Sequence, residues 1–451
     1  MKKLIKRLTK TVALTITATT LLSLCGCFLF DKNSGKIPEY EDDREMMIAG
    51  WDSPMNTLED IQIAKDMGLT HMFLDSYHAK RGTKAYEDAL KLYEQVGLNV
   101  IVQTGSGATV ENTMKDNTNY ADFPIVTHIN YWDEPYYSNI ARIAELAEQH
   151  IDKYGNDILF FGNLFPNSAT PVFEGHTYKE YVKHYADSVL MQFPEEYRWL
   201  SADIYPLDEK NGGSGSAIRS NWLPCIETLA LQAKESNAKT HFFLQATEHY
   251  GYRAVKEEDI RFQFYVNMAF GVQGFSYFTY ADSVLSDFEH SFVARNESGV
   301  IHDTYYNAQK VNNEIKKFDH VYLNYTWQGT LPIVGNNNEE GYNLGFDGLS
   351  APLEDLSMCK RWDASEDALV GTFVDENGYE ALMVVNYTDP ADLCSNLVRF
   401  EFNDVSKVRM YRGGVAYDYK ISNNRLDVEL DPGEGAHRTA DCNRKRSLWN
   451  C

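Results

Sequence analysis

The feature of this sequence that most restricts its fold is an alternation of short apolar runs with amphipathic helical patterns over residues 46–324. The phrase K-D-M-G-L-T-H-M-F, which begins at Lys65, returns as E-Q-V-G-L-N-V-I-V from Glu94. In both copies a glycine fits the left-handed residue that ends a helix just before a buried strand. Helices alternating with buried strands predict an α/β fold with a parallel sheet.

Eight candidate strands can be counted in this region. They end near Trp51, Asp75, Gln103, Glu134, Asn163, Tyr205, Glu248 and Tyr280. Eight β/α units over residues 45–324 predict a (β/α)8 TIM barrel, and a doubly wound open sheet is the competing fold. We favour the barrel because polar and aromatic residues recur at the strand ends, which a barrel gathers at one face.

The pattern changes after Asn324. Strand-like runs at 368–387, Asn396–Phe402 and Arg425–Leu430 follow one another without helices. This succession of strands without helices predicts a small all-β sandwich domain over residues 325–436. Residues 437–451 are basic and lack a strand pattern, so we expect an irregular tail.

The N-terminus has the layout of a secretory signal peptide. Residues 1–10 are basic, and the apolar run at 12–24 is too short and too rich in threonine to span a membrane. The sequence Leu24-Cys25-Gly26-Cys27 resembles a bacterial lipobox. That resemblance implies cleavage after residue 26, acylation of Cys27 and a lipid anchor at the cell membrane or cell surface, outside the cytoplasm. The polar residues 27–44 are expected to form a tether.

The charge of the chain restricts its partners. The chain has 65 Asp and Glu and 42 Lys and Arg, which gives a net charge of -23. Coulomb repulsion therefore disfavours nucleic acid and anionic membrane surfaces as partners. A neutral ligand is expected, and an aromatic content of 13% suits a carbohydrate. The cysteines and histidines are scattered, without C-x-x-C, H-E-x-x-H or Walker patterns, so we expect no metal and no organic cofactor.

The segment V-T-H-I-N-Y-W-D-E-P-Y-Y, residues 126–137, carries the strongest chemical signal. An apolar strand stops at Asp133 and Glu134, and Pro135 prevents its continuation. Carboxyl groups among aromatic rings are what the cleavage of a sugar acetal requires: an acid for the leaving oxygen and flat faces for the sugar. The competing interpretation is a polar turn that caps the next helix.

Glu134 and Glu248 close the fourth and seventh predicted strands. A carboxylate at each of these positions resembles the clan of retaining glycoside hydrolases that includes the family 2, 5 and 42 enzymes. The resemblance implies that Glu134 is the general acid and base, that Glu248 is the nucleophile, and that the substrate is a β-linked oligo- or polysaccharide. Such a mechanism places the two carboxyl groups about 5 to 5.5 Å apart and separates their pKa values.

One residue departs from the pattern of the clan. Asp133 stands where those enzymes usually have asparagine, and a carboxylate cannot donate a hydrogen bond to the sugar as an amide does. Its charge would also raise the pKa of Glu134. This departure favours the alternative of a catalytically inactive, surface glycan-binding lipoprotein with the same barrel. A third interpretation is a carboxylate-only metal site made by Asp75, Asp133 and Asp203.

Further strand-end residues are candidates for binding the substrate. Asp203 and Tyr205 share one strand face because they are two residues apart, and the resemblance implies that Tyr205 orients Glu248. The predicted substrate-binding residues are Trp51, Asp133, Asn163, Asp203, Tyr205 and Tyr280. For each of them ordinary packing is the competing interpretation.

Overall fold

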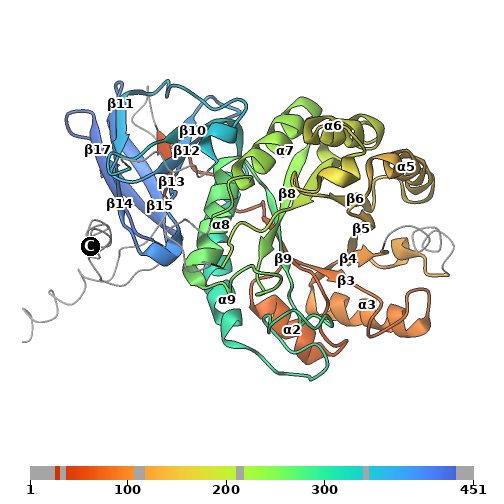
Figure 1. Ribbon diagram of the computed structural model, residues 1–451. Coiled ribbons are helices and arrows are strands. Elements are labelled where there is room, and N and C mark those ends of the chain that lie inside the picture. The colour runs from red at the N-terminus through yellow and green to blue at the C-terminus, as the bar shows by residue number, and fades with distance from the viewer. Residues whose placement is uncertain (1–25, 31–36, 106–116, 210–217, 339–344, 433–451) are drawn as a thin grey trace, which may run out of the picture.

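The computed structural model describes residues 26–30, 37–105, 117–209, 218–338 and 345–432 (Figure 1). The predicted signal peptide, 1–26, lies outside the described residues except for Gly26, and the predicted irregular tail, 437–451, lies outside them entirely. A barrel surrounded by helices and an all-β domain lie side by side (Figure 1). Both parts of the predicted fold are therefore confirmed.

Eight parallel strands close into a barrel. They are β2 (Met47–Gly50), β3 (His71–Leu74), β4 (Asn99–Gln103), β5 (Val126–Asp133), β6 (Leu159–Leu164), β7 (Trp199–Asp203), β8 (Lys239–Gln245) and β9 (Gly274–Phe278). The first strand, β2, pairs with the last, β9, and so closes the barrel; in this pairing Met47 lies opposite Gly274 and Gly50 opposite Tyr277. The open doubly wound sheet is thereby excluded.

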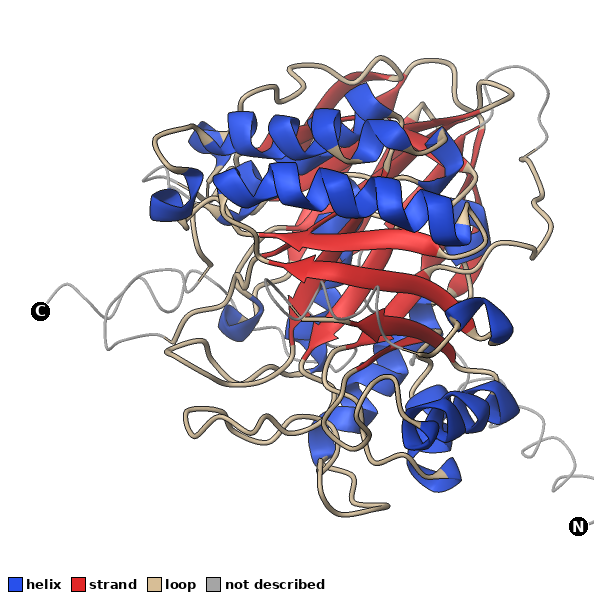
Figure 2. Ribbon diagram, turned by 90° about the vertical axis from the view of Figure 1, so that its right-hand side faces the viewer, coloured by secondary structure: helices blue, strands red, loops and turns tan. Residues whose placement is uncertain are grey.

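Helices cover the outside of the strands (Figure 2). They are α2 (Leu58–Asp66), α3 (Lys84–Val96), α5 (Ile140–Tyr154), α6 (Tyr178–Ser188), α7 (Trp222–Ser236), α8 (Glu257–Ala269), α9 (Asp303–Ile315) and the short α10 (Asp319–Tyr322). Both glycines of the repeated phrase lie in the left-handed region, Gly68 with φ 93° and Gly97 with φ 76°. They end α2 and α3 as the repeat predicts, and a buried strand follows each.

Large side chains fill the barrel interior. Trp51 packs its ring 4.9 Å from that of Phe73 and 5.4 Å from that of Phe243. Met47, Phe161 and Trp199 belong to the same buried cluster. The barrel is a packed core, so a ligand has to bind at its mouth, where the loops after the strands lie.

The β domain consists of two antiparallel sheets. One has the order β10 (Tyr325–Ile333), β12 (Ala368–Asp375), β13 (Glu380–Asn386), β1 (Gly26–Phe30), β15 (Lys407–Arg412) and β16 (Val415–Lys420), and the other is β11 (Cys359–Ala364), β14 (Asn396–Phe402) and β17 (Arg425–Leu430). Alternate side chains of both sheets, such as Val370, Val384, Val398 and Phe400, form one apolar cluster. The domain is thus a sandwich.

Helix α8 joins the two parts of the molecule. It lies between the barrel strands and the β domain (Figure 1) and contacts β8 on one side and β12 and β13 on the other. Every residue from Glu258 to Ala269 is buried. At Gly371 a Cβ atom would lie 2.2 Å from the carbonyl oxygen of Ala269, so only glycine allows β12 to approach the helix this closely. The apolar core continues from the barrel into the β domain.

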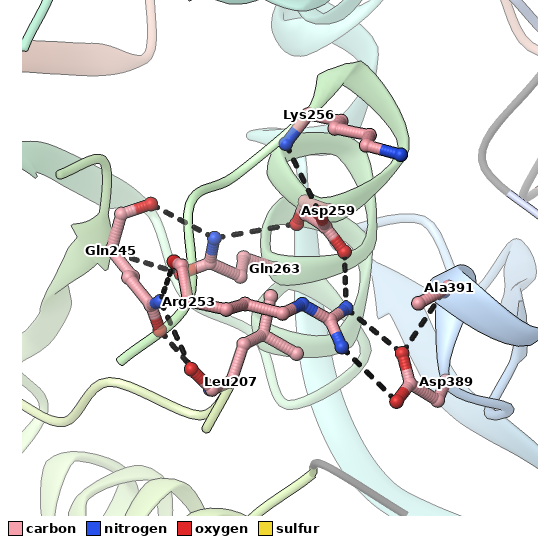
Figure 3. A network of polar contacts seen from close by, with 8 residues as sticks. All are labelled: Leu207, Gln245, Arg253, Lys256, Asp259, Gln263, Asp389 and Ala391. Atoms are coloured by element: carbon pink, nitrogen blue, oxygen red, sulfur yellow. Dashed lines mark hydrogen bonds and ion pairs between the residues drawn. The ribbon is translucent and has the colours of Figure 1, made fainter. Parts of the chain in front are cut away.

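A buried ion network reinforces this junction (Figure 3). Arg253, in the loop between β8 and α8, donates to Asp259 at the start of α8 over 2.5 Å. It also donates to both carboxylate oxygens of Asp389 in the β domain, over 2.8 and 3.1 Å. Gln245, at the end of β8, donates from Nε2 to the carbonyl oxygens of Leu207 and Arg253. These contacts connect the barrel, the helix and the sandwich.

Several residues of the predicted tether, 27–44, contact the folded parts of the molecule. Residues 27–30, together with Gly26 at the end of the predicted signal peptide, form β1, which pairs with both β13 and β15. Ile37 is buried, Glu39 forms an ion pair with Arg409 over 2.7 Å, and the Tyr40 hydroxyl donates to Asp375 over 2.9 Å. Among the residues that the structure describes, no helix has the length and apolar character needed to cross a membrane.

Candidate active site

The backbone at the end of β5 has an unusual conformation. Glu134 lies in the left-handed region with φ 53°, which is unfavourable for a residue with a Cβ atom. Its N–H donates to the carbonyl oxygen of Asn163 over 2.9 Å, and the register between β5 and β6 shifts between Asn130 and Trp132. Strained conformations of this kind concentrate at functional sites, where the surrounding structure maintains them.

Asn163 connects two carboxylates at the mouth of the barrel. Its Nδ2 donates to Asp203 Oδ1 over 3.0 Å and to Asp133 Oδ1 over 3.3 Å. Its Oδ1 accepts from the Ser201 hydroxyl over 2.8 Å, which fixes the orientation of the amide. The strand ends of β5, β6 and β7 therefore bring together the predicted residues Asp133, Asn163 and Asp203.

The carboxyl groups of Asp133, Glu134 and Asp203 form an acidic site, and the pKa of each lies above its ordinary value. Burial raises the pKa of Glu134 strongly, and the charges of Asp203 and then Asp133 raise it further. Burial raises the pKa of Asp133 to about 6, although the hydrogen bond from Asn163 opposes the rise. Burial and the charge of Asp133 also raise the pKa of Asp203. At neutral pH Glu134 is thus a protonated, proton-donating group.

Tyr205 lies two residues after Asp203, just beyond the end of β7. Burial raises the pKa of its phenol well above the usual value, and the charges of Asp203 and Glu134 contribute to the rise. The hydroxyl therefore stays neutral and able to donate. The ring stacks on Phe278 at 5.3 Å, and the rings of His249 and Tyr252 lie 5.4 and 5.5 Å away. Tyr205 thus packs against a cluster of aromatic rings and is close enough to the carboxyl groups for their charges to affect its pKa.

Glu248 lies three residues beyond the end of β8, in the loop after the seventh barrel strand. It is half-buried, and its carbonyl oxygen accepts from the N–H of Glu289 over 3.0 Å. The charges that raise the pKa of Glu134 come from Asp203 and Asp133. The pairing of Glu134 with Glu248 stays a prediction, and Asp203 and Asp133 are the carboxylates whose effect on Glu134 the structure describes.

Two predicted binding residues have packing roles in this structure. Tyr280 is fully buried, its N–H donates to the carbonyl oxygen of Trp51, and its ring lies 6.3 Å from that of Phe292. Trp51 is only 8% exposed and packs in the barrel interior. For these two aromatic residues the ordinary packing interpretation accounts for the contacts observed.

A second polar cluster follows the first two barrel strands. Arg295 forms ion pairs with Asp52 over 3.0 Å and with Asp75 over 2.6 Å, and its guanidinium lies 4.3 Å from the ring centroid of Tyr77. Burial raises the pKa of Asp52 to about 6, against the attraction of Arg295. Because Asp75 is engaged by Arg295, the structure does not support a metal site shared by Asp75, Asp133 and Asp203.

Three members of these clusters are not among the residues predicted from the sequence: Ser201, Asp52 and Arg295. Ser201 has a recognisable signal, because it lies two residues before Asp203 and hence on the same face of β7. Asp52 follows the predicted first strand directly. Arg295 carries no such signal, because it lies far along the chain in the loop between β9 and α9.

The fold and the site together define a TIM-barrel protein with an acidic site at the carboxyl ends of its strands. The chain is similar to the solved β-galactosidase from the psychrophilic Marinomonas ef1, with 11% identity, 61% of this chain and 60% of that chain covered, and a TM-score of 0.46. It is also similar to the β-galactosidase from the haloarchaeon Halorubrum lacusprofundi, with 11% identity, 60% and 58% covered, and a TM-score of 0.42.

The HpcH/HpaI aldolase from Desulfitobacterium hafniense is similar as well, with 11% identity, 52% and 86% covered, and a TM-score of 0.33. The chain matches 60% and 58% of the length of the two β-galactosidases. No protein-family model matches the chain, and no curated protein matches it. The function therefore has to be argued from the site.

Proposed function

We propose that this protein hydrolyses O-glycosidic bonds of a carbohydrate and that Glu134 is the proton donor. One observation carries the proposal: Glu134 is kept protonated by burial and by Asp203 and Asp133, at the mouth of a TIM barrel. A glycosidase needs a carboxyl group that is protonated at the pH of the reaction and a second one that is ionised. Besides Glu134, the site contains the carboxyl groups of Asp133 and Asp203, each with its own set of neighbouring charges and hydrogen bonds.

The proposed reaction is a double displacement that retains the anomeric configuration. Glu134 gives its proton to the glycosidic oxygen while a second carboxylate attacks the anomeric carbon, and the C–O bond to the leaving group breaks. Glu134 then takes a proton from water, which attacks the glycosyl ester and releases the second carboxylate. The resemblance of the sequence supports Glu248 as that carboxylate, and the effect of the Asp203 charge on the pKa of Glu134 supports Asp203.

The test is the release of reducing ends from a panel of β-linked oligosaccharides and aryl glycosides. We compare the wild type with Glu134→Gln, Glu248→Ala and Asp203→Ala, and use Glu148→Gln, on the exposed face of α5, as a control outside the acidic site. Added azide distinguishes the roles: it gives the inverted glycosyl azide in the variant that lacks the nucleophile and the retained product in a variant that lacks the acid.

Loss of turnover in Glu134→Gln but not in Glu148→Gln supports the proposal. Full activity of Glu134→Gln contradicts it. If the wild type binds oligosaccharides without cleaving any, and Asp133→Asn introduces turnover, the glycan-binding alternative replaces it.

We also propose that the protein is held at the cell membrane or cell surface through acylated Cys27, as its resemblance to a lipobox implies. The N-terminal sequence supports this, since a basic segment and an apolar run precede the cysteine. Incorporation of labelled fatty acid in a bacterial host tests it. We expect the label in the wild type and in Cys25→Ser but not in Cys27→Ser, and label in Cys27→Ser would contradict the proposal.

A further inference from the structure

The long loop between β9 and α9 brings together three side chains with metal-binding atoms. Asp282 lies near its start, His290 in its middle and His302 at its end, immediately before α9. The expectation of no metal rested on the scattered histidines of the sequence, and the fold places two of them beside one carboxylate. The three ligand atoms, one from each residue, lie within 4.8 Å of one another.

The distances suit coordination of a common ion. His290 Nδ1 and His302 Nε2 lie 3.1 and 3.2 Å from the same oxygen, Asp282 Oδ2. Nitrogen and oxygen ligands about 2.0 to 2.1 Å from a tetrahedral zinc ion are about 3.3 Å apart. Small movements of the side chains would therefore admit the ion between them.

The backbone holds these ligands in place. Asp282 donates its N–H to the carbonyl oxygen of Val293 over 3.0 Å, and its second carboxylate oxygen accepts from the N–H of Ser291 over 2.8 Å. His302 donates its N–H to the carbonyl oxygen of Phe292 over 2.9 Å. All three contacts involve the short segment 291–293, which directly follows His290. The ligands are thus preorganised, and the contact to Ser291 leaves Oδ2 facing the imidazoles.

The two imidazole rings are stacked at a centroid distance of 4.4 Å with 24° between their planes. Because a histidine nitrogen binds a metal ion in the plane of its ring, one ring has to turn out of the stack when the ion binds. The side chain of His290 is 74% exposed, which leaves room for this turn. Two histidines and one carboxylate are a set that zinc accepts, and they leave a fourth position for water or a ligand oxygen.

A pocket adjoins this cluster. It has a volume of about 300 Å³, and Asp282, Ala294, Arg295 and Asn296 are among the residues that line it. Arg295 also pairs with Asp52 and Asp75 at the mouth of the barrel. The loop that carries the metal ligands therefore also forms part of this mouth.

We propose that Asp282, His290 and His302 bind one divalent transition-metal ion, best represented by Zn²⁺. The ion would tie together the start, the middle and the end of the β9–α9 loop and so hold the pocket open in a fixed shape. This inference does not depend on glycoside hydrolysis, since it concerns residues outside the acidic site.

The test is calorimetric titration of ZnCl₂ into the full chain, purified without a histidine tag and treated with a chelator. We expect one ion per chain. His302→Gln and Asp282→Asn should each weaken binding about tenfold or more. Asparagine at position 282 removes the anionic ligand and can keep its carbonyl oxygen toward the imidazoles, but its amide nitrogen then faces the N–H of Ser291 and that hydrogen bond is lost. Thermal unfolding of this variant without zinc therefore accompanies the titration, and His302→Gln tests the site without this change. The matched control is His176→Gln, because His176, like His290, is an exposed histidine whose ring is stacked, in this case on that of Tyr137 at 3.8 Å.

Limited proteolysis supplies a second readout. Zinc should slow cleavage within residues 283–301 in the wild type and in His176→Gln, and leave cleavage unchanged in His302→Gln. Absence of stoichiometric binding, or equal binding by wild type and both ligand variants, would overturn the site. Binding without protection of the loop would overturn its role in holding the loop.

Discussion

Asp133 shows how the environment of a single residue determines its chemistry. It replaces the amide that the resembled clan uses, and it accepts a hydrogen bond from Asn163 while burial raises its pKa to about 6. The folded protein therefore keeps this proton at pH values where the unfolded chain releases it. The stabilising contribution is complete below about pH 4 and is lost as the pH rises through about 6.

Replacing Asp133 by asparagine should abolish this loss. We expect Asp133→Asn to raise the free energy of unfolding at pH 8 by about 1 to 3 kcal/mol and to change it little at pH 4, because the amide carries no charge at either pH. Urea unfolding at the two pH values measures the effect. Asp187→Asn, at an exposed surface position, is the control and should not show this difference. A loss of stability at pH 8 would contradict the argument.

Arg253 is a residue whose removal should be costly. The exposed fractions of the side chains of Arg253, Asp259 and Asp389 are 13%, 4% and 1%. Arg253→Met leaves two buried carboxylates without their cation, and we expect it to lower the free energy of unfolding by about 3 to 5 kcal/mol. The matched control is Arg399→Met, because the ion pair of Arg399 with Asp363 is largely exposed and should contribute less than about 1 kcal/mol.

Chemical unfolding near neutral pH measures both variants. Part of the loss in Arg253→Met should be recovered in acid, since protonation then neutralises Asp259 and Asp389. Equal effects of the two substitutions would mean that the network at the junction contributes no more than a surface ion pair.

At the scale of elements, the packing of β12 on α8 depends on Gly371. Alanine at this position would place its Cβ atom 2.2 Å from the carbonyl oxygen and 2.8 Å from the Cα atom of Ala269, both backbone atoms that cannot move independently. We expect Gly371→Ala to lower the free energy of unfolding by about 1 to 3 kcal/mol or more. Thermal or urea unfolding measures the change.

Gly378→Ala separates this clash from backbone strain. Gly378 has φ 83°, and an added Cβ atom would meet nothing within 4 Å. Its substitution should cost only the strain of the left-handed conformation, about 1 to 2 kcal/mol. A smaller loss in Gly371→Ala than in Gly378→Ala would show that the sheet moves away from the helix easily.

The elements that could be predicted from the sequence are those with local signals. Periodicity and the glycines of the repeat identified the barrel strands and the ends of α2 and α3, and turn residues identified the sandwich. The strand ends also supplied Asp133, Asn163 and Asp203. Trp51 and Tyr280 have the same signal but pack in the core, because proximity to a strand end does not determine which way a side chain points. β1 and the partners of Arg295 could not be predicted, since they depend on residues far apart in the sequence.

At the scale of the whole molecule, the first described strand completes the β domain. A chain that begins at residue 37 lacks β1 and leaves the facing edges of β13 and β15 unpaired. Unpaired strand edges lower stability and invite association with other chains. We expect such a chain to unfold at lower urea concentration and to self-associate, as measured by sedimentation. A chain that begins at residue 26 is the control, and equal behaviour of the two would mean that β1 contributes nothing.

The position of β1 also imposes an order on biosynthesis. The ribosome makes this strand before the barrel, whereas its partners β13 and β15 come only after the entire barrel has been made. The sandwich cannot close during translation, because both neighbours of β1 are among the last segments to emerge. For most of its synthesis the chain therefore carries β1 without either of the two strands that flank it in the folded protein.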